Sequence, residues 1–172
     1  VGENSTEDWT ETLKIDVVSK VKEGLNRLAT LEPDARLSFV FENYTVQTHK
    51  EPINLRSWPD EHLWISEVMT NLGYNKYNEY YTNVYDFLNH FRDTKNTDWA
   101  IAIFVVNSDK DQDDLFADGH RPYAYLGGPF AVLTLYGGIL NMDYPAAHET
   151  CHLLYATDEF EDDPERSGYL NV

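Results

Sequence analysis

Two histidines and a glutamate stand close together late in the sequence, in the stretch His148-Glu149-Thr150-Cys151-His152. If this stretch is helical, residues four apart lie on one side, and both imidazoles can reach the same metal ion. Zinc binds imidazole nitrogen readily and, in catalytic sites, is held by three protein ligands and one water. The glutamate then lies beside that water, where it can accept a proton and later pass one to a leaving amine. The pattern predicts metal-assisted hydrolysis, with His148 and His152 as zinc ligands and Glu149 as general base.

The elements that must position this motif can be predicted from the hydrophobic pattern. Apolar residues three and four apart indicate helices, alternating or continuous apolar runs indicate strands, and Gly and Pro mark the breaks. Helices are predicted at 7–31, 59–72, 77–93 and 144–155, and strands at 37–46, at 99–108 and in two short stretches within 123–136. The run at 99–108 is continuously apolar, as expected of a strand buried on both faces. We expect one α/β or α+β domain, with a mixed sheet packed on helices.

Composition excludes several classes of function. The chain has 172 residues, 13 Lys+Arg and 30 Asp+Glu, and a net charge of −17. This charge argues against a nucleic-acid partner and against docking on an anionic membrane. The strongly apolar run at 99–106 is too short to span a bilayer, so no membrane insertion is expected. Cys151 is the single cysteine, which excludes an intrachain disulfide and a cysteine-based zinc site.

The motif and its surroundings resemble a known family. The stretch HETCHLLYATDEF, residues 148–160, is similar to the active-site helix of the metzincin clan of zinc metallopeptidases, in particular the HExxHxxxAxDEY type of secreted microbial members. The upstream segment FVVNSDKDQDDLFADG…YAYLGGPF is also similar to that group, so the resemblance covers residues 99–171. It implies a metzincin-like mixed, mostly parallel sheet with an antiparallel edge strand. It also implies a secreted enzyme, and we expect a monomer.

The resemblance assigns further residues. Asp158 would be the third zinc ligand, and Glu159 is the alternative. On a continuous helix Glu159 would lie about 16 Å along the axis from His148, so either acid requires a bend. Tyr123, Ala124, Tyr125 and Leu126 would form the edge strand, to which a protein or peptide substrate adds as an extra antiparallel strand.

The sequence departs from the metzincin pattern at two places. Tyr155 stands where that family has a glycine, and tyrosine disfavours positive φ, so we expect the turn one residue later. Metzincins also have a methionine-containing turn after the motif, in a carboxyl-terminal subdomain. Here the two methionines, Met69 and Met142, both precede the motif. We therefore expect residues 1–172 to form a single zinc-peptidase catalytic domain that lacks the carboxyl-terminal Met-turn subdomain.

Asp109, Asp111 and Asp113 alternate in an acidic loop, as ligands do in calcium loops. The loop lacks the turn glycine and the closing glutamate of such loops. Two interpretations therefore stay open: a calcium site, or an acidic loop that is simply solvated.

Two functions of different classes remain open. The first is a zinc-dependent endopeptidase. The second is a catalytically inactive, metal-stabilised binding or adhesion module with an acidic surface. Such a module would have no use for Glu149 as a base. A different HExxH clan with a distant glutamate ligand is a third possibility, with only Glu159, Glu161 and Glu165 downstream.

Overall fold

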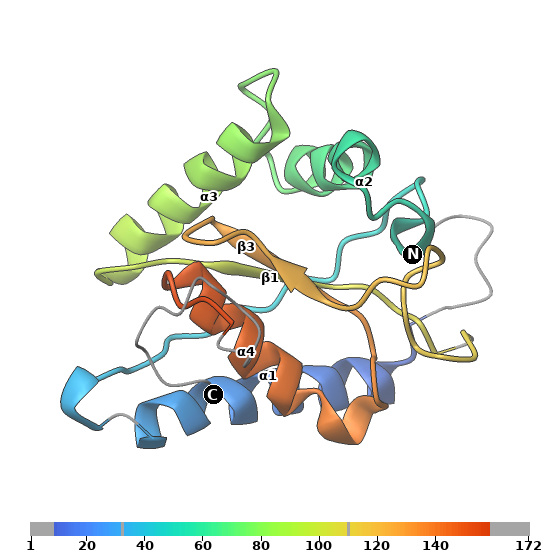
Figure 1. The fold of residues 1–172 in the computed structure, drawn as a ribbon. Helices are drawn as coiled ribbons and strands as arrows, with labels where there is room; N and C mark the ends of the chain where they lie inside the picture. Colours follow the sequence, from blue (N-terminus) through green and yellow to red (C-terminus); the bar gives the residue numbers. More distant parts are fainter. Residues whose placement is uncertain (1–8, 32, 110, 159–172) are drawn as a thin grey trace.

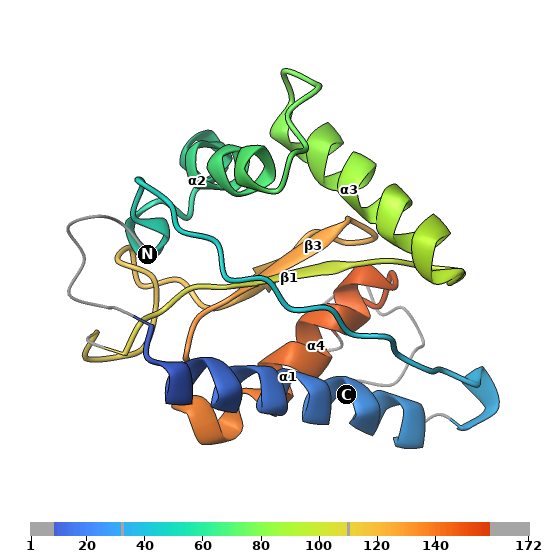
Figure 2. The same ribbon diagram turned by 180° about the vertical axis from the view of Figure 1, so that it is seen from behind.

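The computed structural model describes residues 9–31, 33–109 and 111–158 and shows a mixed α+β fold (Figures 1 and 2). Its helices are α1 (Glu11–Leu31), α2 (Trp58–Asn71), α3 (Tyr80–Lys95) and α4 (Asp143–Leu153), and its strands are β1 (Ala102–Val105), β2 (Tyr123–Ala124) and β3 (Phe130–Leu133). Three short 3-10 turns lie at Pro33–Ala35, Pro52–Asn54 and Ile139–Asn141. The strands form one mixed sheet in the order β1-β3-β2, in which β3 pairs in parallel with β1 and antiparallel with β2.

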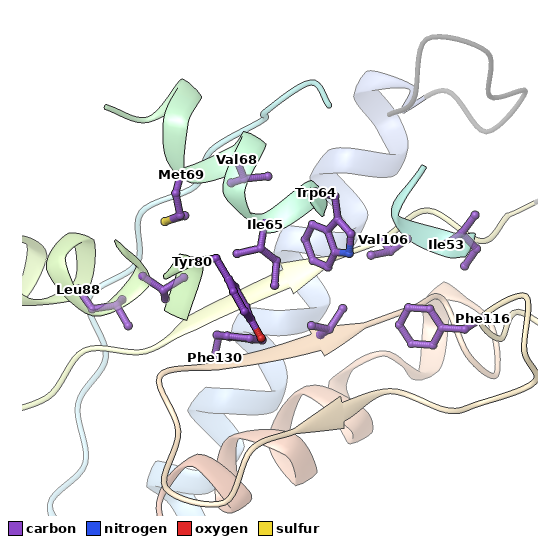
Figure 3. Packing of buried hydrophobic residues seen from close by; sticks show 12 residues of the cluster. Ile53, Trp64, Ile65, Val68, Met69, Tyr80, Leu88, Val106, Phe116 and Phe130 are labelled. Atoms are coloured by element: carbon purple, nitrogen blue, oxygen red, sulfur yellow. The ribbon is translucent and has the colours of Figure 1, made fainter. Parts of the chain in front are cut away.

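Helices cover both faces of this small sheet. Figures 1 and 2 show α2 and α3 on one side of the strands and α1 and α4 on the other. Successive residues of β3 alternate between the two faces, so Phe130 and Val132 join the cluster under α2 and α3, while Leu133 joins the cluster under α1 and α4. Figure 3 shows Trp64, Ile65, Val68 and Met69 of α2 lying over the strands. β3 is therefore the strand that is buried along its whole length.

The four predicted helices are confirmed, with boundaries shifted by a few residues. α1 begins at Glu11, where the Thr10 hydroxyl caps the helix by accepting the Leu13 N–H at 3.1 Å. α1 crosses α4 closely at Gly24, because a Cβ atom there would lie 2.2 Å from the Asp143 carbonyl oxygen. Arg27 then binds the buried Asp143 carboxylate at 2.8 Å. This contact fixes the amino-terminal end of the helix that carries the histidine motif.

The strand predicted at 37–46 is wrong. The segment is extended, with Phe39 and Phe41 packed towards α1 and with Val40 and Tyr44 exposed, so the predicted alternation of sides is present. Within the described ranges, however, no backbone hydrogen bond joins it to β1. A cavity of about 760 Å³ is lined by this segment, α1 and β1. Alternation predicts which side chains point inward, but strand pairing also needs a neighbour at the right distance.

The prediction that 99–108 is buried on both faces is also wrong, because the segment 37–46 does not pair with it. β1 covers only Ala102–Val105, and its residues are partly buried, because β1 forms an edge of the sheet beside that cavity. Among the helices in the described ranges, none has the length and apolar character that crossing a bilayer would require.

Candidate metal centre

α4 presents His148 and His152 one turn apart, as the sequence predicted. The helix follows β3 through the turn at Ile139–Asn141, and its inner face is buried through Ala146, Thr150 and Leu153. The Thr150 hydroxyl donates to the Ala146 carbonyl at 2.7 Å, so this buried polar group is satisfied within the helix. With that face packed inward, the two imidazoles lie on the partly exposed side.

The end of α4 turns the chain back towards the histidines. Tyr155 takes a left-handed conformation with φ of 70°, and hydrogen bonds run from Tyr155 N–H to the His152 carbonyl and from Ala156 N–H to the Cys151 carbonyl, each at 3.0 Å. These two bonds are the Schellman pattern that ends many helices. The prediction that the turn would come one residue later is therefore wrong: tyrosine itself occupies the position that favours glycine.

The ring of Tyr155 packs on a residue that leaves room for it. A Cβ atom on Gly127 would lie 2.2 Å from the Tyr155 ring, so only glycine permits this contact. The Gly127 N–H also donates to the His152 carbonyl at 2.9 Å. The loop after β2 thus supports the strained turn after α4.

The turn brings Asp158 to the two histidines, and one ligand atom from each of the three residues lies within 4.8 Å of the others. His148 Nε2 and His152 Nε2 are 3.1 Å apart, and Asp158 Oδ1 lies 3.2 Å from the first and 3.6 Å from the second. Two ligand atoms on a tetrahedral zinc ion, each about 2.0–2.1 Å from the metal, are separated by about 3.3 Å. The three donor atoms therefore have the spacing that such an ion needs.

The hydrogen bonding of His152 leaves the correct nitrogen available. Its Nδ1 lies 2.8 Å from the Ala156 carbonyl oxygen, which can only accept, so Nδ1 carries the proton. In the neutral ring Nε2 then has a free electron pair directed at His148 and Asp158. Metal-binding histidines are commonly oriented by such a carbonyl.

Two further observations fit a cation. Asp158 Oδ1 is buried and accepts no hydrogen bond from the described residues, an arrangement that costs free energy unless another group binds it. The site is also partly open, since the side chains of His148, His152 and Asp158 are 37%, 16% and 35% exposed. A catalytic zinc site needs such an opening for water, whereas a structural site is closed by a fourth protein ligand.

The surroundings of His148 and Glu149 favour the neutral form of each side chain. Burial, together with the neighbouring His152, lowers the pKa of His148, and Asp158 opposes this effect. Glu149 is 7% exposed, and burial raises the pKa of its carboxyl group to about 7, against the influence of His152 and with that of Asp158. A carboxyl group with this pKa can both accept and release a proton near neutral pH.

The predicted edge strand lies beside the site. β2 forms the edge of the sheet opposite β1, runs antiparallel to β3 and covers Tyr123 and Ala124. Tyr125 and Leu126 follow it, and Leu126 is 53% exposed. Because Gly127 is bonded to the last turn of α4, the end of this edge stands next to the metal-binding side chains.

The described residues of the acidic loop do not form a second group of side chains that could hold a metal ion. In the described residues, the donor set that could hold a metal is that of α4 and Asp158, and Asp109, Asp111 and Asp113 form none. Asp113 Oδ1 instead accepts the Leu115 N–H at 3.2 Å. Burial and the neighbouring Asp113 and Asp114 raise the pKa of Asp111. Calcium binding at this loop stays a prediction, and the alternative zinc ligand Glu159 lies outside the described residues.

Sequence reasoning missed a buried carboxylate, Glu61. It is fully buried on α2 and accepts hydrogen bonds from three tyrosines. A signal was present, because Glu61 precedes Trp64, Ile65 and Val68 at spacings of three, four and seven and so lies on the apolar face of the helix.

Searches of protein-family models, of curated proteins and of solved structures found no significant match to this chain.

Proposed function

We propose that this protein is a zinc-dependent peptidase whose centre is formed by His148, His152 and Asp158, with Glu149 as general base. The observation that carries the proposal is the convergence of three potential ligand atoms, one of them a buried carboxylate oxygen without a hydrogen-bond donor among the described residues, beside a buried carboxyl group. The metzincin-like character of the motif, and secretion, are parts of the same proposal and rest on the sequence resemblance.

The residues present divide the chemistry between them. A bound zinc ion supplies a Lewis acid that polarises the scissile carbonyl and lowers the pKa of a coordinated water to about 7. Glu149 accepts the proton that the attacking water loses as its oxygen bonds to the carbonyl carbon. When the carbon–nitrogen bond breaks, the same carboxyl group returns a proton to the leaving amine.

The substrate is an extended segment of a protein or peptide. β2 presents an edge that no other described strand covers, and a peptide can pair with it through main-chain hydrogen bonds. Such pairing would lay the peptide alongside the loop that contacts His152. Affinity then depends mainly on backbone geometry, and the exposed Leu126 offers an apolar contact for a substrate side chain.

The inactive binding module is less well supported. A purely structural zinc site has four protein ligands, whereas three converge here in the described part of the chain. It would also gain nothing from burying Glu149 next to the ligands, since removing a carboxyl group from water costs free energy.

The decisive experiment combines metal analysis with Glu149→Gln. Purified protein is loaded with zinc, its metal content is measured, and hydrolysis of casein and of quenched peptides is assayed with and without a chelator. We expect one zinc per chain and chelator-sensitive hydrolysis. Glu149→Gln should keep the zinc and lower kcat/KM by about 10²- to 10⁴-fold.

Glu79→Gln is the matched control, because it makes the same change at an exposed position. It should behave as the wild type. Full activity in Glu149→Gln would refute the general base, and a protein that binds zinc and gains stability from it but hydrolyses nothing would support the binding module instead.

A further inference from the structure

The buried Glu61 carboxylate ties together parts of the chain that are distant in sequence. Its two oxygens accept three phenol O–H groups, from Tyr80 at 2.6 Å, Tyr125 at 2.6 Å and Tyr123 at 2.5 Å. Tyr80 belongs to α3, and Figure 3 shows its ring extending from that helix towards Phe130 on the sheet. Tyr123 lies in β2 and Tyr125 just after it, two residues apart and therefore on the same side of the strand.

The hydrogen bonds, and no ion pair, stabilise this carboxylate. Among the described residues no lysine, arginine or histidine forms an ion pair with Glu61; the nearby Arg56 binds Asp118 instead, at 2.8 Å. An apolar side chain of similar size at such a position is often as stable as a buried charge, so stability alone gives little reason for a carboxylate here. What a carboxylate does provide is directionality, because it fixes the phenol groups at defined positions.

From Tyr125 a short chain of contacts leads to the candidate metal centre. Gly128 N–H donates to the Tyr125 carbonyl at 2.7 Å, and Gly127 N–H donates to the His152 carbonyl at 2.9 Å. Gly128 has no room for a side chain, since a Cβ atom would lie 2.6 Å from the Tyr81 hydroxyl and 2.7 Å from Tyr125 Cβ. The loop therefore has little freedom to move once the Tyr125 ring is held.

We propose that Glu61 is a positioning residue for the candidate peptidase site. It holds the edge strand β2 and the loop 126–128 at a fixed place beside the last turn of α4, so that an extended peptide paired with β2 passes the metal-binding side chains. This inference rests on the proposed function, and it specifies that the substrate binds along the whole edge segment 123–126.

The test compares Glu61→Gln with Tyr80→Phe. Both variants weaken the same buried cluster, but Tyr80→Phe leaves the bonds from Tyr123 and Tyr125 to Glu61 in place. For each variant, KM and kcat are measured with a quenched octapeptide that the wild type cleaves and with the tripeptide that carries its scissile bond. Zinc affinity and amide hydrogen exchange of residues 123–128 are measured in parallel.

For Glu61→Gln we expect KM for the octapeptide to rise about 10-fold, because an edge strand that is no longer held in place pairs less tightly with the peptide. KM for the tripeptide, and zinc affinity, should stay within about 3-fold of the wild type, because neither depends on the length of the paired edge. Exchange at 123–128 should become faster. Tyr80→Phe should leave KM and this exchange unchanged.

Equal effects of the two variants on KM and exchange would overturn the inference and make Glu61 a structural core residue only. If Glu61→Gln does not fold, Tyr125→Phe takes its place with the same expected results. If the wild type binds zinc without cleaving any peptide, the proposed function fails, and the exchange measurement still decides whether Glu61 holds β2 beside α4.

Discussion

Two carboxylates, Asp158 and Glu61, occupy opposite situations in this molecule. Asp158 is about one-third exposed, lies against two imidazoles and has a buried oxygen that no described group satisfies. Glu61 is fully buried, and both of its oxygens accept hydrogen bonds from tyrosines.

The difference indicates what each group is for. An unpartnered buried oxygen costs free energy, and beside two imidazoles a bound cation would remove that cost. A fully buried carboxylate whose two oxygens both accept hydrogen bonds within the chain is not accessible to a ligand and serves to hold elements together. On this view the first site carries the chemistry and the second sets the geometry around it.

The largest effect is expected from Asp158→Ala. Removing one of three ligands should weaken zinc binding by more than about 100-fold, since loss of even an outer partner of a ligand costs about 10- to 100-fold. Stability without zinc should change little at pH 8, because Asp158 Oδ1 accepts no hydrogen bond from the described residues and its contacts with the two imidazoles are ion pairs only when a ring is protonated. Competition with a fluorescent zinc indicator measures the affinity.

Asp16→Ala, at an exposed position on α1, is the control for Asp158→Ala and should bind zinc as the wild type does. Unchanged zinc affinity in Asp158→Ala would break the comparison, because the two carboxylates would then both be structural, and Glu159 would become the candidate third ligand.

The tyrosine cluster should make the fold sensitive to alkali. Burial, and then hydrogen bonding to Glu61, raises the pKa of Tyr80, Tyr123 and Tyr125 above the ordinary value of 10.0. The folded protein therefore holds these phenol protons more tightly than the unfolded chain. Their contribution to stability is complete below pH 10 and is lost as the pH rises towards the folded pKa, at about 1.4 kcal/mol per pH unit for each tyrosine.

Urea unfolding between pH 8 and pH 12 measures this dependence. Tyr80→Phe should reduce the slope above pH 10 by about 1.4 kcal/mol per pH unit, and Tyr44→Phe, at an exposed position, should not. Equal slopes for wild type and Tyr80→Phe would show that this phenol does not stay protonated in the folded state.

The parts of the molecule that follow from local spacing could be predicted, and those that depend on long-range placement could not. His148 and His152 face one side because they are one turn apart on the same helix, and the sequence contains that fact. Whether 37–46 pairs with a neighbouring strand, and which groups bind Glu61, depends on how distant elements pack. Tyr155 illustrates the limit: its intrinsic preference opposes positive φ, and its contact with Gly127, a residue far away in sequence, outweighs that preference.

Gly127 lies between the candidate metal centre and the tyrosine cluster around Glu61, and Gly127→Ala should disturb both. Its φ is 64°, which costs alanine about 1 kcal/mol, and the added methyl group would collide with the Tyr155 ring. We expect a loss of about 2 kcal/mol in the free energy of unfolding, typical of forcing a methyl group into a filled space. Gly73→Ala is the control, since it carries the same backbone strain, with φ of 88°, and has nothing within 4 Å of the added atom. A loss no larger than that of Gly73→Ala would mean that Tyr155 does not pack on Gly127.

The smallest effect is expected from Tyr155→Gly, and it completes a double-mutant cycle with Gly127→Ala. Glycine relieves the positive φ by about 1 kcal/mol, while loss of a ring that is 62% exposed removes a contact of similar size, so the net change in stability should be under about 1 kcal/mol. In the double variant the alanine methyl no longer meets the ring, and the combined loss should be smaller than the sum of the single losses. Additive losses in urea unfolding would contradict the contact. Because the turn itself persists with glycine at 155, zinc affinity should be retained, which separates the turn geometry that the metal site needs from the tyrosine ring.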